Sequence, residues 1–84
     1  MPHNPTVAPR VFQILSDLTG LPDLQNFPDL NLFEEGLLDS LTLVRLMVEL
    51  SQALHLEISP ADVVREEWAT PKGILHWVET QLAA

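Results

Sequence analysis

The sequence predicts an all-α protein, a four-helix bundle with a short third helix and a long loop between the first and second helices. Apolar residues recur at the spacing of one helix face in three stretches, and no alternation of apolar and polar residues is long enough for a confident strand. A capping residue followed by proline, which is typical of a helix start, occurs twice in the second half. The 84 residues suffice for one small domain, expected over residues 6–84 after a disordered, proline-rich start, residues 1–5.

The first helix is predicted to begin between Thr6 and Pro9, because proline is tolerated in a first helical turn. Gly20 is a typical C-terminal stop, and Pro22 prevents the helix from continuing. Five apolar residues fall on one face at helical period and are expected to point into the core: Val7, Val11, Ile14, Leu15 and Leu18.

The connection between the first two helices, residues 21–39, contains two prolines and Gly36. A loop of this length in a compact domain is usually functional or packed by its own side chains. Its apolar residues are therefore expected to pin it onto the helices, and they are Leu24, Phe27, Leu30, Leu32 and Phe33.

The second helix is predicted over residues 40–54. Placed at intervals of about 100°, its side chains form one narrow polar stripe, which consists of Thr42, Arg45, Glu49 and Gln52. Across from this stripe lie Leu43, Leu46, Met47, Leu50 and Leu54. A further apolar line on the edge consists of Leu41, Val44 and Val48. The apolar arc is wider than one packing face requires, so either the helix is nearly surrounded or part of its edge is exposed for a partner.

A short third helix is predicted over residues 60–66, where the sequence "SPAD" supplies a cap, a first-turn proline and a first-turn acid. Thr70 followed by proline repeats the signal and starts a fourth helix over residues 71–82. Trp68 and Trp77 are expected to pack in the core rather than to recognise a partner. The inward face of the fourth helix is expected to carry Ile74, Leu75, Val78 and Leu82.

Composition excludes several classes of function. The formal net charge is −8, from twelve acids and four bases, so phosphates are repelled and neither nucleic acid nor an anionic lipid surface is a suitable partner. The charge suits a protein partner with a basic patch, or it only keeps a small domain in solution. Cysteine is absent, which fits a reducing cytoplasm. No signal peptide and no apolar run of about 18 residues is present, so we expect no transmembrane segment.

Ser40 stands before the long apolar pattern of the second helix and is open to two interpretations from the residues alone. It can be the N-cap of that helix, with Asp39 favoured beside the positive end of the helix. It can instead be a nucleophile, but a hydrolase would need a base within hydrogen-bond reach, and His55 lies at the far end of the helix, about 20 Å away. Glu34 and Glu35, with Asp39, lack the spacing of a metal site, so none is expected.

The stretch "LFEEGLLDSLTLVRLMVEL" resembles the acyl carrier protein family and its peptidyl carrier relatives, whose signature is Asp-Ser-Leu at the start of the second helix of a four-helix bundle. The resemblance covers about residues 7–82. It implies that Ser40 carries a 4′-phosphopantetheine arm, transferred from coenzyme A by a phosphopantetheinyl transferase, with Asp39 helping to position the metal and coenzyme A. The thiol of the arm would hold an acyl or aminoacyl thioester, so the chain would be a carrier and not an enzyme.

The resemblance also implies partner enzymes, namely an adenylating acyl or aminoacyl ligase and a downstream acyl-transfer or condensing enzyme. The apolar line beside the serine is then the candidate contact surface, and its residues are Leu41, Val44 and Val48, with Thr42 and Arg45 beside them. The alternative for these apolar residues, above all for Val44, is packing in the core. We expect the carrier to be a monomer.

Two features distinguish among carriers. Fatty-acid-type carriers commonly place acids where this chain has Thr42 and Arg45. The sequence "FEEGLLDS" and the junction around Trp68 look like D-alanyl carrier proteins, although that group often has Phe where this chain has Leu41. The sequence "LVRLMVEL" equally resembles the stand-alone peptidyl carriers of secondary metabolism, which hold an amino acid or an acyl group derived from one. We therefore favour a stand-alone aminoacyl carrier, and both cell-wall D-alanylation and a biosynthetic pathway stay open at this point. A fatty-acid or polyketide acyl carrier stays as an alternative, and so does an unmodified acidic helical adaptor that binds a basic protein.

Overall fold

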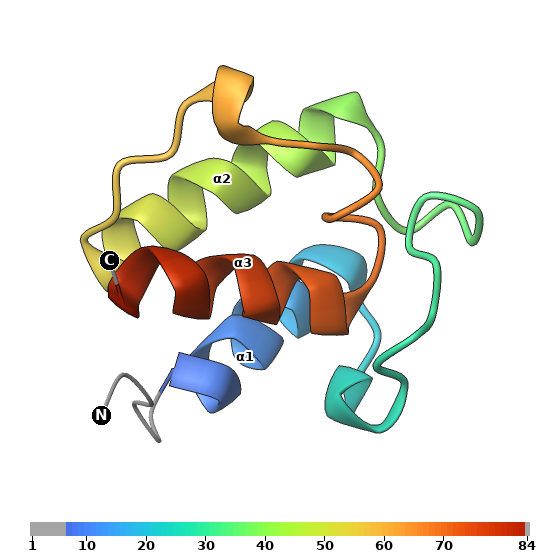
Figure 1. The fold of residues 1–84 in the computed structure, drawn as a ribbon. Coiled ribbons are helices and arrows are strands. Elements are labelled where there is room, and N and C mark those ends of the chain that lie inside the picture. Colours follow the sequence, from blue (N-terminus) through green and yellow to red (C-terminus); the bar gives the residue numbers. More distant parts are fainter. Residues whose placement is uncertain (1–6, 84) are drawn as a thin grey trace.

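The computed structural model describes residues 7–83, which form three α-helices and two short 3₁₀ helices (Figure 1). The α-helices are α1 (Val7–Thr19), α2 (Ser40–Leu54) and α3 (Pro71–Ala83), and the 3₁₀ helices are η1 (Leu24–Asn26) and η2 (Pro60–Asp62). No strand occurs in this part of the chain, so the all-α prediction is confirmed. The disorder predicted for residues 1–5 concerns a segment outside the described residues.

Helix α1 packs against both α2 and α3 (Figure 1). Its buried residues are those that the helical spacing predicted, namely Val7, Val11, Ile14 and Leu15, and Leu18 is half-buried. The helix ends at Thr19 because Gly20 takes a positive φ of 77° and donates its N–H to the carbonyl of Ser16 at 2.8 Å.

The core is one cluster that draws on all three α-helices and on the connections. Trp68 is fully buried, and its ring lies 5.1 Å from the ring of Trp77 at an angle of 56°, so both tryptophans pack in the core as predicted. Two expected core residues are on the surface instead. Phe27 is 54% exposed because η1 turns Leu24 inward and Phe27 follows its last residue. Leu82 is 37% exposed in the last turn of α3.

The segment predicted as the short third helix differs from expectation. Only Pro60–Asp62 is helical, as a 3₁₀ turn in which Ser59 and Asp62 form the reciprocal bonds of a capping box. Val63 then takes an extended conformation (φ −93°, ψ 114°) and packs half-buried against the core. Extended backbone suits a β-branched residue, and this packing ends the helix after three residues.

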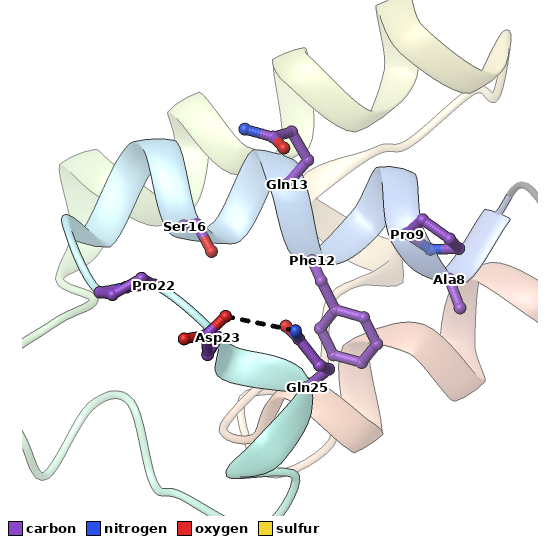
Figure 2. A pocket seen from close by; sticks show the side chains of 8 residues that line it. All are labelled: Ala8, Pro9, Phe12, Gln13, Ser16, Pro22, Asp23 and Gln25. Atoms are coloured by element: carbon purple, nitrogen blue, oxygen red, sulfur yellow. Dashed lines mark hydrogen bonds between the residues drawn. The ribbon is translucent and has the colours of Figure 1, made fainter.

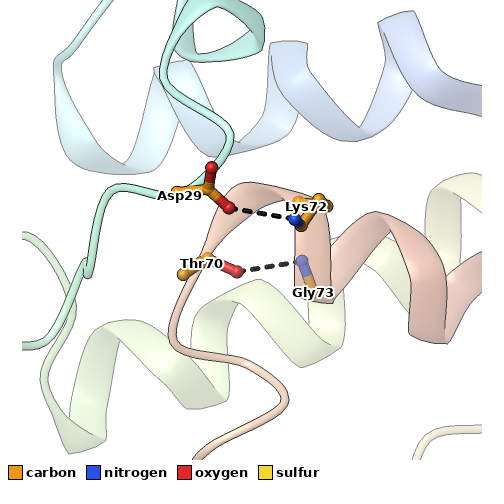
Figure 3. Close-up of polar contacts among 4 residues, drawn as sticks. All are labelled: Asp29, Thr70, Lys72 and Gly73. Carbon is orange, nitrogen blue, oxygen red and sulfur yellow. Dashed lines mark hydrogen bonds and ion pairs between the residues drawn. The ribbon is translucent and has the colours of Figure 1, made fainter.

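The long connection is tied to the start of α3. The N–H of Leu32 donates to the carbonyl of Ala69 at 2.7 Å, and the N–H of Lys72 donates to the carbonyl of Pro28 at 3.1 Å. Figure 3 shows an ion pair of 3.0 Å between Lys72 and Asp29 beside the cap of α3, where the Thr70 hydroxyl accepts a hydrogen bond from an N–H of the first turn. The ion pair is exposed and contributes little, so the backbone bonds hold the loop.

Candidate functional site

A tight turn fixes the chain immediately before the conspicuous serine. The carbonyl of Leu32 accepts hydrogen bonds from the N–H groups of Leu37 and Leu38 at 2.9 and 3.0 Å. Gly36 makes this turn possible because its φ of 75° lies in the region that favours glycine. Leu38 is buried in the core, so the two residues that follow it emerge at the surface from a fixed point.

Asp39, and not Ser40, is the cap of α2. The Asp39 carboxylate accepts a hydrogen bond from the backbone N–H of Thr42 at 2.8 Å. This bond lowers the pKa of Asp39 below that of an ordinary aspartate, because it stabilises the ionised form. The interpretation of Ser40 as the N-cap is therefore wrong, because the carboxylate of Asp39 caps the helix.

Ser40 is the first residue of α2, and its side chain is exposed. Within residues 7–83 its hydroxyl makes no hydrogen bond that holds the fold. A surface serine without such a bond contributes little to stability. The hydroxyl is thus available to a group brought from outside.

A groove of about 280 Å³ opens beside Ser40, and we call it the serine groove. Residues of two segments line it: Ser40, Leu43, Val44 and Met47 of α2, and Pro60, Val63 and Arg65 of the segment that follows α2. A second hollow of about 310 Å³ shares Val44, Met47 and Pro60 with it and continues along α2 to Val48 and Ile58. The serine therefore stands at one end of a long, mostly apolar depression.

The sequence left open whether the apolar line of Leu41, Val44 and Val48 packs in the core or is exposed, and the structure shows that it is exposed. Leu41, Val44 and Val48 are 73%, 52% and 49% exposed, whereas Leu46, Met47 and Leu50 are buried. Helix α2 is thus not surrounded, and Val44 is not a core residue. Arg45 is exposed beside this edge, and Thr42 is half-buried.

The histidines of residues 7–83 lie outside the serine groove. His55 follows the last residue of α2, and His76 lies in α3; neither lines the serine groove. Residues 7–83 contain no group of three or more His, Cys, Asp or Glu side chains placed to hold a metal ion. A larger cavity of about 570 Å³ lies between α1 and η1, where Gln25 donates a hydrogen bond of 3.5 Å to Asp23 near Phe12 (Figure 2). It does not include Ser40.

None of the helices in the described part of the chain is both long and apolar enough to cross a membrane.

Sequence reasoning missed five of the seven residues that line the groove. Leu43 and Met47 were predicted only on the side of the second helix across from the polar stripe. The other three, which were not predicted at the site, are Pro60, Val63 and Arg65. They come from the segment after α2, and only the tertiary fold brings that segment beside Ser40. Arg65 did carry a signal, because it is one of only four basic residues in the chain. Nothing local in the sequence placed it near the serine.

The comparisons with known proteins agree with this geometry. Residues 9–78 match the family model described as the phosphopantetheine attachment site. The chain is 48% identical over 69 residues to the D-alanyl carrier protein of Enterococcus faecalis, an alignment that covers 82% of this chain and 88% of that protein. It is 45% identical over 69 residues to the D-alanyl carrier protein of Lacticaseibacillus casei, which covers 82% of this chain and 85% of that protein.

A third relative is the D-alanyl carrier protein of Bacillus mycoides, which is 39% identical over 70 residues, or 83% of this chain and 89% of that protein. These findings define a class: the chain is a carrier protein that bears covalent 4′-phosphopantetheine. More narrowly, it belongs to the family of the phosphopantetheine attachment site, and the relatives named above are D-alanyl carriers. When bound, the arm supplies a thiol, which this cysteine-free chain does not contain.

Proposed function

We propose that Ser40 is the attachment point of the arm and that the chain carries an amino acid on it as a thioester. One observation supports this assignment above all. The Ser40 hydroxyl is exposed at the first position of α2, and the neighbouring Asp39 has taken over the capping that would otherwise engage it. The Ser40 hydroxyl is therefore accessible to a transferase, and the turn anchored by the buried Leu38 fixes its position at the surface.

The attachment step needs a transferase, because no histidine of residues 7–83 lines the groove with Ser40 and the adjacent Asp39 carboxylate is engaged by the N–H of Thr42. The Ser40 oxygen attacks the phosphorus next to the pantetheine in coenzyme A. A phosphorus–oxygen bond forms, the pyrophosphate bond breaks, the bisphosphorylated nucleoside leaves and the transferase takes the serine proton. Asp39, exposed and kept ionised by its lowered pKa, is suited to help the transferase hold the metal and coenzyme A. The carrier itself catalyses no bond change.

The proposed cargo is D-alanine. The support comes from the relatives, which are D-alanyl carrier proteins and align with more than four fifths of this chain. The uncharged and basic residues at Thr42 and Arg45 also argue against a fatty-acid carrier, in which this surface is commonly acidic. An adenylating ligase would form the aminoacyl adenylate and transfer the aminoacyl group to the arm.

The proposed partner surface is the exposed edge of α2. Leu41, Val44 and Val48 offer apolar contacts beside the arm, and Arg45 offers a charge that an acidic patch of the ligase or of the downstream acyl-transfer enzyme can recognise. We place the carrier in the cytoplasm, as a monomer with one domain over residues 6–84. In the four-helix arrangement of this family, the Pro60–Asp62 turn takes the position of the short third helix.

The test is a loading assay on protein that already bears the arm. Incubation with a D-alanine-adenylating ligase, ATP and D-alanine is expected to add one alanyl group, which hydroxylamine removes as it cleaves thioesters. L-alanine with the same ligase, and a fatty acid with a fatty-acyl ligase, serve as controls. Efficient loading by the fatty-acyl ligase alone would replace the proposed cargo with an acyl chain. No loading by either ligase, on protein whose arm has been verified by mass, would contradict the proposed aminoacyl cargo.

A further inference from the structure

Arg65 is a cation at the edge of the serine groove, in a chain whose net charge is −8. It lies in the turn after η2, is exposed and lines the serine groove together with Ser40. Its guanidinium carbon stands 4.1 Å from the centre of the Phe33 ring. Phe33 belongs to the connection that leads to Ser40, so two segments far apart in sequence meet here.

The contact with Phe33 orients Arg65 without neutralising it. A guanidinium stacked on an aromatic face keeps its N–H groups free in the plane of the fork. Glu34 and Glu66 line a neighbouring hollow together with Arg65, yet within residues 7–83 neither carboxylate forms an ion pair with it. Lys72, by contrast, is paired with Asp29. Arg65 therefore retains its capacity to bind an anion at the edge of the serine groove.

We propose that Arg65 binds the phosphodiester at the base of the arm. The inference rests on the proposed attachment at Ser40, which would place a permanent negative charge at the edge of a groove that Arg65 also lines. Guanidinium groups bind phosphate oxygens with two parallel hydrogen bonds, and a covalently tethered phosphate is present at high effective concentration. Phe33 restricts the side chain beforehand, so less conformational entropy is lost when the bond forms.

The proposed contact gives Arg65 a positioning role. It would hold the first atoms of the arm toward the serine groove and away from the Leu41 side of α2. It would also offset the repulsion that a new negative charge meets in a chain of net charge −8. Arg65 takes no part in forming or breaking the thioester.

The test uses protein bearing the arm and compares Arg65→Gln with Arg10→Gln, which makes the same charge change on α1 outside the groove. The phosphorus resonance of the wild-type arm is expected to differ from that of a phosphopantetheinyl-serine peptide and to approach it as salt is added. In Arg65→Gln it should sit at the peptide value at all salt concentrations. Arg10→Gln should match the wild type.

Two further measurements separate the contact from a general structural effect. The Arg65 Nε–H resonance should shift when the arm is added to the wild-type protein, and Arg65→Lys should restore part of the phosphorus shift because it keeps the charge. Phe33→Leu should give an intermediate shift, because it removes the aromatic ring that orients Arg65 but keeps the guanidinium. An arm attached at Ser40 with the same phosphorus resonance in Arg65→Gln and wild type would overturn this inference alone. No attachment at Ser40 would overturn the proposed function itself.

Discussion

The two apolar edges of helix α2 have similar compositions and opposite environments. Leu46, Met47 and Leu50 are at most 7% exposed and form part of the core. Leu41, Val44 and Val48 lie one turn apart along the other edge and are about half exposed or more. The first edge contributes to the core that stabilises the domain. The second adds nothing to the core, and it begins at the residue that follows Ser40.

This contrast separates the core of the domain from the surface that we propose for partner contacts. A domain of 84 residues has few apolar side chains to spare, and a line of exposed ones costs solubility. Such a line beside an exposed serine is readily explained by partner enzymes that must approach the arm. Substitutions on the buried edge should change the free energy of unfolding. Substitutions beside the exposed edge should change the loading of the arm.

The largest expected effect is on the buried edge. Leu50 is fully buried, so Leu50→Ala should lower the free energy of unfolding by about 2–5 kcal/mol, through lost burial and the cavity that remains. Val48→Ala, two residues away on the exposed edge, should change it by no more than about 0.5 kcal/mol. Urea denaturation followed by circular dichroism measures both. Equal losses in the two variants would mean that the edges do not differ as described.

The next effect is on recognition. Arg45→Glu should slow loading by the cognate ligase about tenfold, which corresponds to about 1.4 kcal/mol, because it reverses a charge beside the proposed contact surface. Arg10→Glu makes the same reversal on α1 and serves as the control. Steady-state loading rates at two salt concentrations provide the readout. If Arg45→Glu loads as fast as Arg10→Glu, the contact surface lies elsewhere.

A smaller effect concerns the cap between the two edges. The hydrogen bond from Thr42 lowers the pKa of Asp39 in the folded state, so its stabilisation is present above the pKa of an unfolded aspartate, about 3.9. This stabilisation is lost as the pH falls through the lower folded pKa. Asp39→Asn should therefore change stability little at pH 7, since asparagine also caps helices, and should flatten the stability curve below about pH 4.

Urea midpoints of the wild type and Asp39→Asn between pH 2 and pH 7 would measure this difference, with both proteins at one ionic strength. Parallel curves over the whole range would show that Asp39 does not titrate as the cap geometry requires.

Helix positions and the core were the most predictable features from sequence. Periodicity places α1 and α2 to within about a residue, because each buries one face. Gly20 also marks the end of α1 in the sequence. The segment after Pro60 was less predictable, because its caps favour a helix whereas packing of Val63 against the core favours extended backbone. Local signals cannot settle a competition that tertiary contacts decide.

The site divides in the same way. Ser40 and the apolar line of Leu41, Val44 and Val48 could be located from the sequence, because both lie on one helix of known period. That this line is exposed could not be predicted, because it depends on which segments pack against α2. The cap could not be assigned between two adjacent residues that are both good caps, and only the backbone of Asp39 (φ −132°, ψ −174°) decides it. Arg65 stacks on Phe33, which is 32 positions earlier in the chain. A contact between residues so far apart leaves no pattern in the sequence, so the place of Arg65 in the groove could not be predicted.

The most direct test of the central claim is the intact mass of the protein after incubation with coenzyme A and a broad-specificity phosphopantetheinyl transferase. Ser40→Ala is the decisive variant, because it should change stability by no more than about 0.5 kcal/mol now that Asp39 is the cap. Ser16→Ala makes the same change on α1. The account predicts a gain of one phosphopantetheine arm in the wild type and in Ser16→Ala, and none in Ser40→Ala. An arm on folded Ser40→Ala, or no arm on the folded wild type, would contradict it.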